Sequence, residues 1–272
     1  FSMVKSIFKA VVDPHGPANE GWFKHLKLTI PDGTVFSATY PNSTGWYFEI
    51  ASQAADLVWR AFSSLNFNNT SAGSYVSLAA SFIYGTDHRN DKPFMIVEPH
   101  AGGWGAMDDA DGASGLIAIL DGDTYNYSIE LFEAKFPIRC HRYELNTLGG
   151  SGHGKYRGGF GIVREYEILC KSAYTYCNIG RSVTEPWGLH GGSNGSTNYM
   201  LIKSKKEGVK QVSRIPPTRL DRGTKLEIVT GGGGGYGDPK ERDTALIKSD
   251  IKNDLLSPSE AKSVYKFSGK NV

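Results

Sequence analysis

The sequence is poor in cysteine, in net charge and in long apolar runs, and each shortage excludes a class of protein. Three scattered cysteines, Cys140, Cys170 and Cys177, favour a reducing cytoplasm over a disulfide framework. Thirty Lys and Arg against 28 Asp and Glu leave a net charge of +2 without a basic block, which argues against a nucleic-acid partner. No stretch approaches the ~20 apolar residues of a membrane span, and no secretion signal is visible. We therefore expect a cytoplasmic protein without a membrane partner.

The pattern of apolar residues predicts an α+β fold of one large domain or two small parts. Alternation over 26–30, followed by a turn, predicts two strands. Apolar spacing from Ala54 predicts an amphipathic helix over 51–65, in which Trp59 and Phe62 are expected to belong to the core rather than to a binding stripe. Residues 94–98 are expected to form a buried strand that leads into a glycine cluster.

Beyond residue 128 a short helix over 128–136 is expected, ended by Pro137. The pattern then becomes strand-like, and 219–223 is expected to be a turn before the last strand. A capping box at Ser257 predicts a terminal helix. The expected strands cover 162–169, 173–179, 199–202 and 225–229. We divide the chain into a mixed α/β part, 1–138, and a β-rich part with a C-terminal helical tail, 139–272.

Glycine is the residue in excess: 33 of 272 residues, about 12%, against an average near 7%. The glycines cluster at 102–115, 149–161, 188–195 and 231–237. They fit a β-rich fold with many tight corners or loops that line a ligand, and the composition leaves both interpretations open.

Three short motifs match known binding or catalytic patterns in spacing, but each lacks a residue or a neighbouring element that the pattern requires. Gly149–Lys155 has the P-loop spacing, but Tyr156 stands where a magnesium-binding hydroxyl is required. Gly232–Gly237 has the dinucleotide spacing, yet too little chain follows for a βαβ unit. Ser193 sits in a G-x-S-x-G motif among loop residues with no histidine after His190. The histidines and cysteines show no zinc spacing, so we expect no metal site in this chain.

Four glycine-containing segments, taken together, resemble the hydantoinase B/oxoprolinase family, and the resemblance covers almost the whole chain. A fifth segment, Asn126–Glu133, lies between the first and the second of them. The four segments are Val97–Ala106, Lys155–Gly161, Pro186–Gly192 and Gly231–Pro239. Thr147-Leu148 departs from the Asp-Ser that many relatives carry there, so any contribution of that pair is lost here.

The resemblance implies that the chain corresponds to the C-terminal half of such a protein, either as a fragment or as one subunit of a split enzyme. It implies that the metal-binding residues lie in the missing N-terminal half and that a hydantoinase A-like partner uses ATP. The implied reaction is ATP-dependent ring-opening hydrolysis of a cyclic amide of the 5-oxoproline or hydantoin class. The alternatives are a subunit of an acetone- or acetophenone-type ketone carboxylase, or a non-catalytic scaffold half of either complex.

Ring opening needs a base to activate water and donors to hold the developing oxyanion. Glu130 and Glu133 share a helix face, where close carboxylates raise one pKa; solvated or paired surface acids are the alternative. Arg157 could clamp a phosphate or a carboxylate, or it could be structural. His100 opens a glycine turn after a strand, a common place for a functional side chain, and it is a candidate catalytic residue together with Glu130, Glu133 and Arg157.

Backbone N–H groups in glycine-rich turns are the candidate oxyanion or phosphate donors, because no side chain blocks their approach to a ligand. The candidates are Gly102, Gly103, Gly158 and Gly159. Convergence of all these residues on one pocket would favour a share in catalysis. Dispersal, together with an exposed apolar face for a missing partner, would favour the scaffold; we expect such a face.

Overall fold

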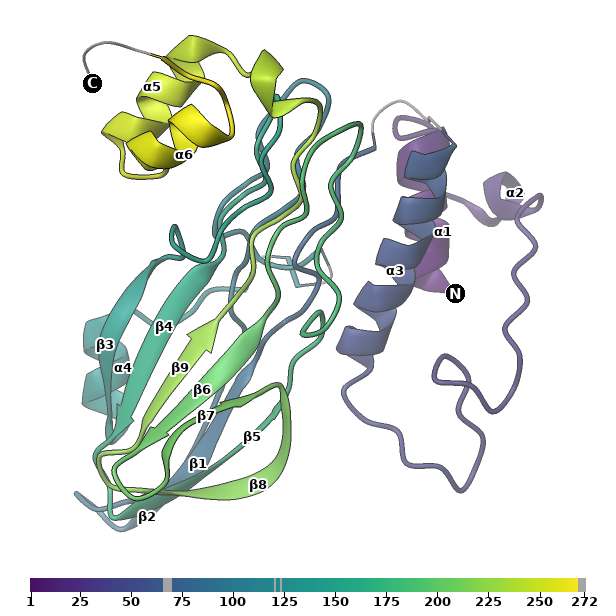
Figure 1. Ribbon diagram of the computed structural model, residues 1–272. Helices are drawn as coiled ribbons and strands as arrows, with labels where there is room; N and C mark the ends of the chain where they lie inside the picture. The colour runs from purple at the N-terminus through teal and green to yellow at the C-terminus, as the bar shows by residue number, and fades with distance from the viewer. Residues whose placement is uncertain (66–69, 120, 123, 269–272) are drawn as a thin grey trace.

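The computed structural model describes residues 1–65, 70–119, 121–122 and 124–268, with helices at both ends of the chain and two antiparallel sheets between them (Figure 1). This arrangement confirms the predicted α+β class. Within the described residues, no helix is long and apolar enough to cross a membrane.

Two sheets face each other in the middle of the molecule. The first has the strand order β2-β1-β5-β8 and the second β3-β4-β9-β6-β7. The strands are β1 (Ser81–Asp87), β2 (Lys92–Glu98), β3 (Ile138–Leu145), β4 (Ile162–Ile168), β5 (Ser172–Asn178), β6 (Tyr199–Ser204), β7 (Gly208–Val212), β8 (Arg214–Asp221) and β9 (Lys225–Val229). The first sheet joins strands from both sides of residue 138, so the parts 1–138 and 139–272 share one framework, and their division stays a prediction.

The helices confirm the periodicity found in the sequence. The predicted helices 51–65 and 128–136 correspond to α3 and α4, and α6 begins with the predicted capping box. The helices are α1 (Ser2–Val12), α2 (Glu20–Phe23), α3 (Tyr47–Ser64), α4 (Ile129–Lys135), α5 (Thr244–Lys252) and α6 (Pro258–Ser263), with a 3-10 turn η1 (Pro239–Glu241).

Several predicted strands need correction. Residues 26–30 form no strand, because no neighbouring segment pairs with them; only an isolated bridge joins Thr34 and Ser37. Strand β2 exists but is not buried, since it lies at a sheet edge with Met95 and Val97 at least half exposed. The edge strands β7 and β8 were not predicted from the sequence. Residues 219–221 of the expected turn at 219–223 belong to β8.

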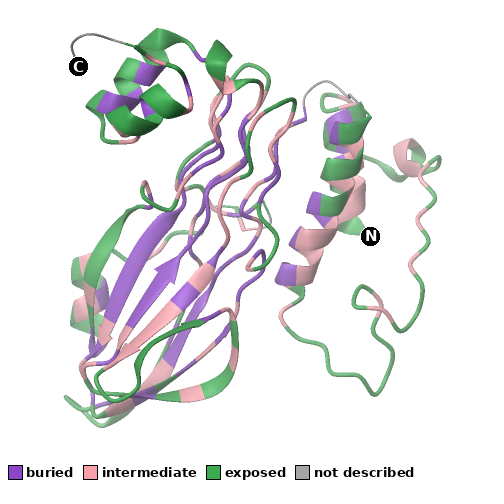
Figure 2. Cartoon of the chain, viewed as in Figure 1, coloured by how far each residue is buried: buried purple, intermediate pink, exposed green. Residues whose placement is uncertain are grey.

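The sheets enclose the main core, built from large side chains. Ile83 and Ile96 come from the first sheet, and Ile168 and Leu226 from the second. Helix α4 adds Phe132, which has no exposed surface. Figure 2 shows β4 and β9 buried along most of their length.

The glycines gather in a second interior, which we call the glycine bundle. Its extended segments run from the sheets towards α5 and α6 (Figure 1). Backbone N–H groups of one segment donate to carbonyls of another, as Gly233 does to Gly159 and Gly103 to Gly231. A Cβ atom on Gly233 would lie 2.0 Å from the Trp104 carbonyl oxygen. The bundle comprises residues 71–76, 101–106, 111–116, 149–161, 186–196 and 230–237.

Close approach of backbones, rather than tight turning, therefore explains most of the glycine excess. Within the bundle only four glycines have a positive φ, where a turn requires glycine. The others have ordinary φ values, and most of them have backbone atoms of a neighbouring segment where a side chain would stand; Gly102 instead faces the Tyr75 ring and Gly149 the Asn146 side chain. The sequence clusters mark a structural interior made of main chain.

The segment from residue 24 to 46 leaves the body as a long open arm (Figure 1). Its backbone hydrogen bonds, such as Gly33 N–H to the Ser37 carbonyl, remain within the arm or join its two ends to α2 and α3. Tyr40 is 99% exposed and Val35 is 67% exposed. These are exposed apolar side chains of the kind that a missing partner would cover; what covers them stays a proposal.

Candidate functional site

A fully buried polar cluster surrounds His100, between the ends of β1 and β2 and the middle of β4. His100 has no exposed surface, and its Nε2 lies 2.6 Å from the Ser81 Oγ. Its Nδ1 makes no hydrogen bond with any described residue. Burial, with the nearby charge of Arg164 as the second cause, lowers the pKa of His100 to about 3. The imidazole is therefore neutral at physiological pH.

Charged residues complete this cluster. Arg164 on β4 is fully buried, and its Nη2 lies 3.4 Å from Oε2 of Glu98. The Tyr166 hydroxyl donates to the same Glu98 oxygen at 2.6 Å. The Arg164 guanidinium also lies over the rings of Tyr143 and Tyr166, 4.5 and 5.0 Å from their centroids. A buried ion pair between the two sheets fixes their relative position, and alternation along a strand gave no sign of it.

The two predicted carboxylates on α4 differ in their surroundings. Glu133 accepts a hydrogen bond at 2.8 Å from the backbone N–H of Cys140, so it connects α4 to β3. Glu130 is exposed in the first turn of the helix. They lie three residues apart on one helix, as predicted, but only Glu133 contacts the body of the protein. A catalytic role for either stays a prediction.

Arg157 clamps a carboxylate in two places, and that carboxylate belongs to the same chain. Its Nε and Nη2 donate to the two oxygens of Asp250 on α5, both at 3.2 Å. Arg242 joins this network with bonds of 2.7 Å to Asp250 and 2.7 and 2.8 Å to Asp111. The bidentate geometry that makes arginine a phosphate binder is here used to hold α5 against the glycine bundle.

The four predicted oxyanion donors lie inside the glycine bundle. The N–H of Gly102 donates to Leu116, and that of Gly158 donates to Gly152. The N–H groups of Gly103 and Gly159 donate to carbonyls in the same way. In this arrangement the four amides are engaged by the protein itself, so a role in holding a substrate oxyanion stays a prediction that requires a different arrangement.

The predicted site residues therefore do not meet in one place. Arg157 lies against α5, Glu130 and Glu133 lie on α4 beside the sheets and away from α5, and His100 is enclosed between the sheets (Figure 1). In the described part of the chain, no group of three or more His, Cys, Asp or Glu side chains could hold a metal ion.

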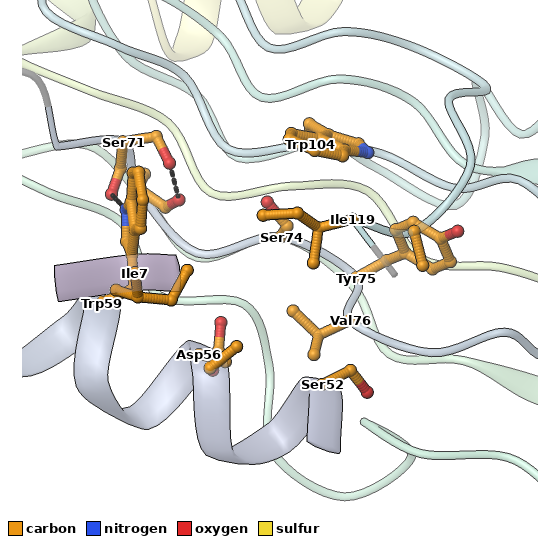
Figure 3. A pocket seen from close by; sticks show the side chains of 13 residues that line it. Ile7, Ser52, Asp56, Trp59, Ser71, Ser74, Tyr75, Val76, Trp104 and Ile119 are labelled. Carbon is orange, nitrogen blue, oxygen red and sulfur yellow. Dashed lines mark hydrogen bonds between the residues drawn. The ribbon is translucent and has the colours of Figure 1, made fainter. Parts of the chain in front are cut away.

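A cavity lies elsewhere, between α3 and the glycine bundle (Figure 3). Its volume is about 70 Å³, and its wall is mostly apolar. Trp59 and Asp56 reach it from α3, and Trp104 lies across from them. Thirteen residues line it: Ile7, Ser52, Ala55, Asp56, Trp59, Ser71, Ala72, Ser74, Tyr75, Val76, Trp104, Ala118 and Ile119.

The sequence analysis did not predict this cavity, because the buried face of α3 includes polar residues that the apolar spacing does not indicate. Ser52 and Asp56 are buried, whereas the apolar Leu57 and Leu65 are 56% and 68% exposed. Val58 and Trp59 are half-buried against α1, so the prediction that Trp59 packs in a core is confirmed. The sequence carries no signal that Asp56 is buried, because the contacts that bury this face of α3 come from distant segments.

A family model and individual relatives agree on one family for this chain. The family model described as "Hydantoinase B/oxoprolinase" matches residues 1–239. The putative B component of a D-/L-hydantoinase from Pseudomonas sp. (strain NS671) is 29% identical over 90% of this chain and 41% of its own length. The beta component of the caprolactamase of Pseudomonas jessenii is 32% identical over 92% of this chain and 44% of its own.

Solved structures show the same fold. The ATP-dependent caprolactamase from Pseudomonas jessenii superposes with a TM-score of 0.82 at 24% identity, over 99% of this chain and 48% of that chain. A nucleotide-free acetone carboxylase superposes with a TM-score of 0.77 at 19% identity, over 97% of this chain and 40% of that chain. The chain thus spans less than half the length of the proteins it matches.

Proposed function

This chain belongs to the hydantoinase B/oxoprolinase family, and on that premise we propose that it is part of a hydantoinase B-type subunit in an ATP-dependent enzyme that hydrolyses a cyclic amide. The observation that carries the proposal is the continuous family match through residue 239. Relatives at about 30% identity support the substrate class, because their names refer to hydantoin and to caprolactam, both cyclic amides. A ring of this class would be opened by water to an open-chain acid.

We propose that ATP is bound by a hydantoinase A-like partner and a metal ion by a part of the enzyme outside this chain. The glycine loop 149–155 does not fit a nucleotide, because several of its amides are already engaged. The N–H of Gly152 donates to the Gly233 carbonyl, and that of His153 to the Ser193 Oγ. A phosphate cradle requires such amides to point at the ligand, so the residues present do not support a phosphate site here.

Within the enzyme, we assign this part the role of a rigid support for the reacting residues. The contacts of the predicted site residues support that role: Arg157 holds α5, Glu133 holds the start of β3, and His100 sits between the sheets. The exposed arm offers apolar side chains that other polypeptide segments could cover, and the chain matches less than half of the length of its relatives. Both observations fit a supporting part of a larger assembly. This combines the cyclic-amide reaction with the scaffold alternative.

The test is to purify the complex that assembles with this chain in its source and to assay it. We expect it to form ADP and the ring-opened product from hydantoin, 5-oxoproline or caprolactam, with both products measured by mass spectrometry. A matched assay supplies acetone, ATP and labelled bicarbonate. Incorporation of label into a keto acid without any lactam opening would overturn the proposal in favour of the ketone carboxylase. Recovery of the chain alone, without partners, would contradict the multi-subunit assignment.

A further inference from the structure

One segment of the arm has the sequence of a strand but no partner strand among the described residues. Apolar side chains at Leu26, Leu28 and Ile30 alternate with exposed polar ones over residues 26–30. The N–H of Leu26 donates to the Phe23 carbonyl at the end of α2, and the other residues of the segment make no backbone hydrogen bond with any described residue. A strand needs neighbouring strands to be stable, so we expect its neighbour in another chain.

Strand β2 is an outer strand of the first sheet and is open on one side. It pairs with β1, and apart from this pairing no described residue hydrogen-bonds to the backbone of residues 93–97. Met95 and Val97 lie on the face of β2 that is turned away from the core, and they are 56% and 50% exposed. An edge strand with exposed apolar side chains is a template for a strand of another chain.

The other edge strands carry features that resist the addition of a strand. Strand β8 contains Pro216 and Pro217, which have no N–H to donate. The register of β3 shifts between Cys140 and Arg142, which interrupts its ladder. Strand β7 has only 5 residues and exposes Lys210. On β2 the proline lies next to the start of the strand, so its apolar part is the open edge.

Helix α4 runs beside β2 in the opposite direction. Arg89, in the turn before β2, donates to the Lys135 carbonyl at the end of α4. The Tyr127 N–H, shortly before α4, donates to Glu98 at the end of β2. The start of β2 therefore lies near the end of α4, and the end of β2 lies near the exposed Glu130 in the first turn of α4.

The charges at the two ends of this edge fix the direction of an added strand. At the start of β2, Lys92 and Lys135 outnumber Asp91, whereas the other end is acidic. In the arm, Lys24 precedes the strand-like segment and Asp32 follows it, and both are exposed. An antiparallel arm brings Asp32 to the basic end and Lys24 to the acidic end. A parallel arm would bring like charges together.

We propose that residues 26–30 pair antiparallel with β2 of a second copy of this chain, so that two copies exchange arms around a two-fold axis. The arm of each chain lies on the side of α1 and α3, away from its own β2 (Figure 1), so the edge that it pairs with belongs to the other copy. Each copy supplies one strand and one edge, and the contact therefore closes as a dimer. The apolar side of the segment covers Met95 and Val97 of the other copy.

The first experiment measures the mass of the 272-residue chain by sedimentation velocity over a concentration series. We expect twice the mass of the single chain at high concentration and dissociation on dilution. Leu28→Pro removes an N–H that the single chain does not use, so it should leave the fold intact and weaken self-association by about tenfold or more. Thr44→Pro, at an exposed position near the other end of the arm, is the matched control and should leave self-association unchanged.

The second experiment tests the position of the contact by disulfide cross-linking between copies. Leu28→Cys protein is mixed under oxidising conditions with Met95→Cys protein or, separately, with Val97→Cys protein, the two members of each mixture carrying different affinity tags. We expect a cross-linked species that carries both tags in at least one of these mixtures. Leu57→Cys, on α3 and 56% exposed, is the control partner and should give none with Leu28→Cys.

A single-chain mass at every concentration would overturn the inference and leave the arm to a different polypeptide. A dimer that Leu28→Pro does not weaken, or that gives no cross-link from Leu28→Cys to either position on β2, would place the contact elsewhere and would overturn it as well. The inference goes beyond the proposed function and does not depend on it, because the mass and the cross-link require no substrate. A dimer joined by its arms stands even if the complex opens no lactam.

Discussion

The molecule has two interiors that are built in opposite ways. Between the sheets, large side chains such as Ile83 and Phe132 fill the space, and the backbones are kept apart. In the glycine bundle the backbones themselves fill the space, and the N–H of Gly233 reaches the carbonyl of Gly159 directly. The first interior is therefore sensitive to loss of volume, and the second to its addition.

The two interiors also differ in the substitutions that they tolerate. The sheet core can tolerate exchanges that conserve volume, because neighbouring side chains adjust. Most contact points of the bundle have no side chain that could adjust; the atoms facing Gly158, for example, are the backbone of Gly233 and Gly234. Its geometry is fixed by hydrogen bonds between segments, and these join the sheets to the region of α5.

The largest expected effect is the addition of one methyl group to the bundle. Gly233→Ala would place a Cβ 2.0 Å from the Trp104 carbonyl oxygen and 2.2 Å from its carbon. Because only backbone could move, we expect a loss of more than about 4 kcal/mol in the free energy of unfolding, measured by urea denaturation. Gly45→Ala, with no atom within 4 Å, is the control and should change it by less than about 1 kcal/mol. A Gly233→Ala protein as stable as the parent would refute the backbone-packed interior.

The second prediction removes volume from the sheet core. Phe132 has no exposed surface, and its ring stacks on Tyr166 at a centroid distance of 5.2 Å. Phe132→Ala should therefore cost about 3–5 kcal/mol of the free energy of unfolding. Leu131→Ala, at a position 53% exposed on the same helix, should cost less than about 1 kcal/mol. Similar values for the two variants would mean that α4 does not seal this core.

The two interiors also differ in how far the sequence predicts them. Period and capping are local, so α3, α4 and the Ser257 capping box could be predicted. The glycine clusters were visible too, but which backbone faces Gly233 depends on segments more than 70 residues apart, as with Gly159. Local pattern cannot encode that pairing, so the excess looked like turns or ligand loops.

The sequence likewise indicated one part of the candidate site and not the rest. The motif around His100 drew attention to a region that does contain a buried polar cluster. The sequence analysis did not single out its charged partner Arg164, because the strand on which it lies becomes buried on both faces only in the fold. Asp56 was hidden for the same reason, since its helix is buried by contacts that sequence spacing does not show.

The third prediction concerns pH and the polar part of the sheet core. The pKa of His100 is about 3 in the folded protein, below its ordinary value of about 6.5. Between these values the unfolded chain binds a proton that the folded one does not, so stability is present above pH 6.5 and is lost as the pH falls. The loss is about 1.4 kcal/mol per pH unit, or roughly 2 kcal/mol at pH 5.

The measurement is the free energy of unfolding at pH 7.5 and at pH 5 for the parent and for His100→Gln. The variant should lose about 2 kcal/mol less than the parent over this interval. His15→Gln, an exposed position, removes a histidine outside the cluster and should keep the parental slope. Parallel slopes for parent and His100→Gln would show that His100 does not remain neutral in the folded protein.

The smallest expected effect tests whether the α4 carboxylates support the fold or the reaction. Glu133→Ala removes the acceptor of the Cys140 N–H and should lower the free energy of unfolding by about 1 kcal/mol, whereas Glu130→Ala should change it by less than about 0.5 kcal/mol. Both should leave kcat of the assembled enzyme within about twofold, because general acid–base residues contribute 10²–10⁴-fold and neither carboxylate is assigned to the reaction. A hundredfold fall in kcat for either variant, at unchanged stability, would return that residue to the catalytic machinery and would show that α4 faces the reacting ring in the assembled enzyme.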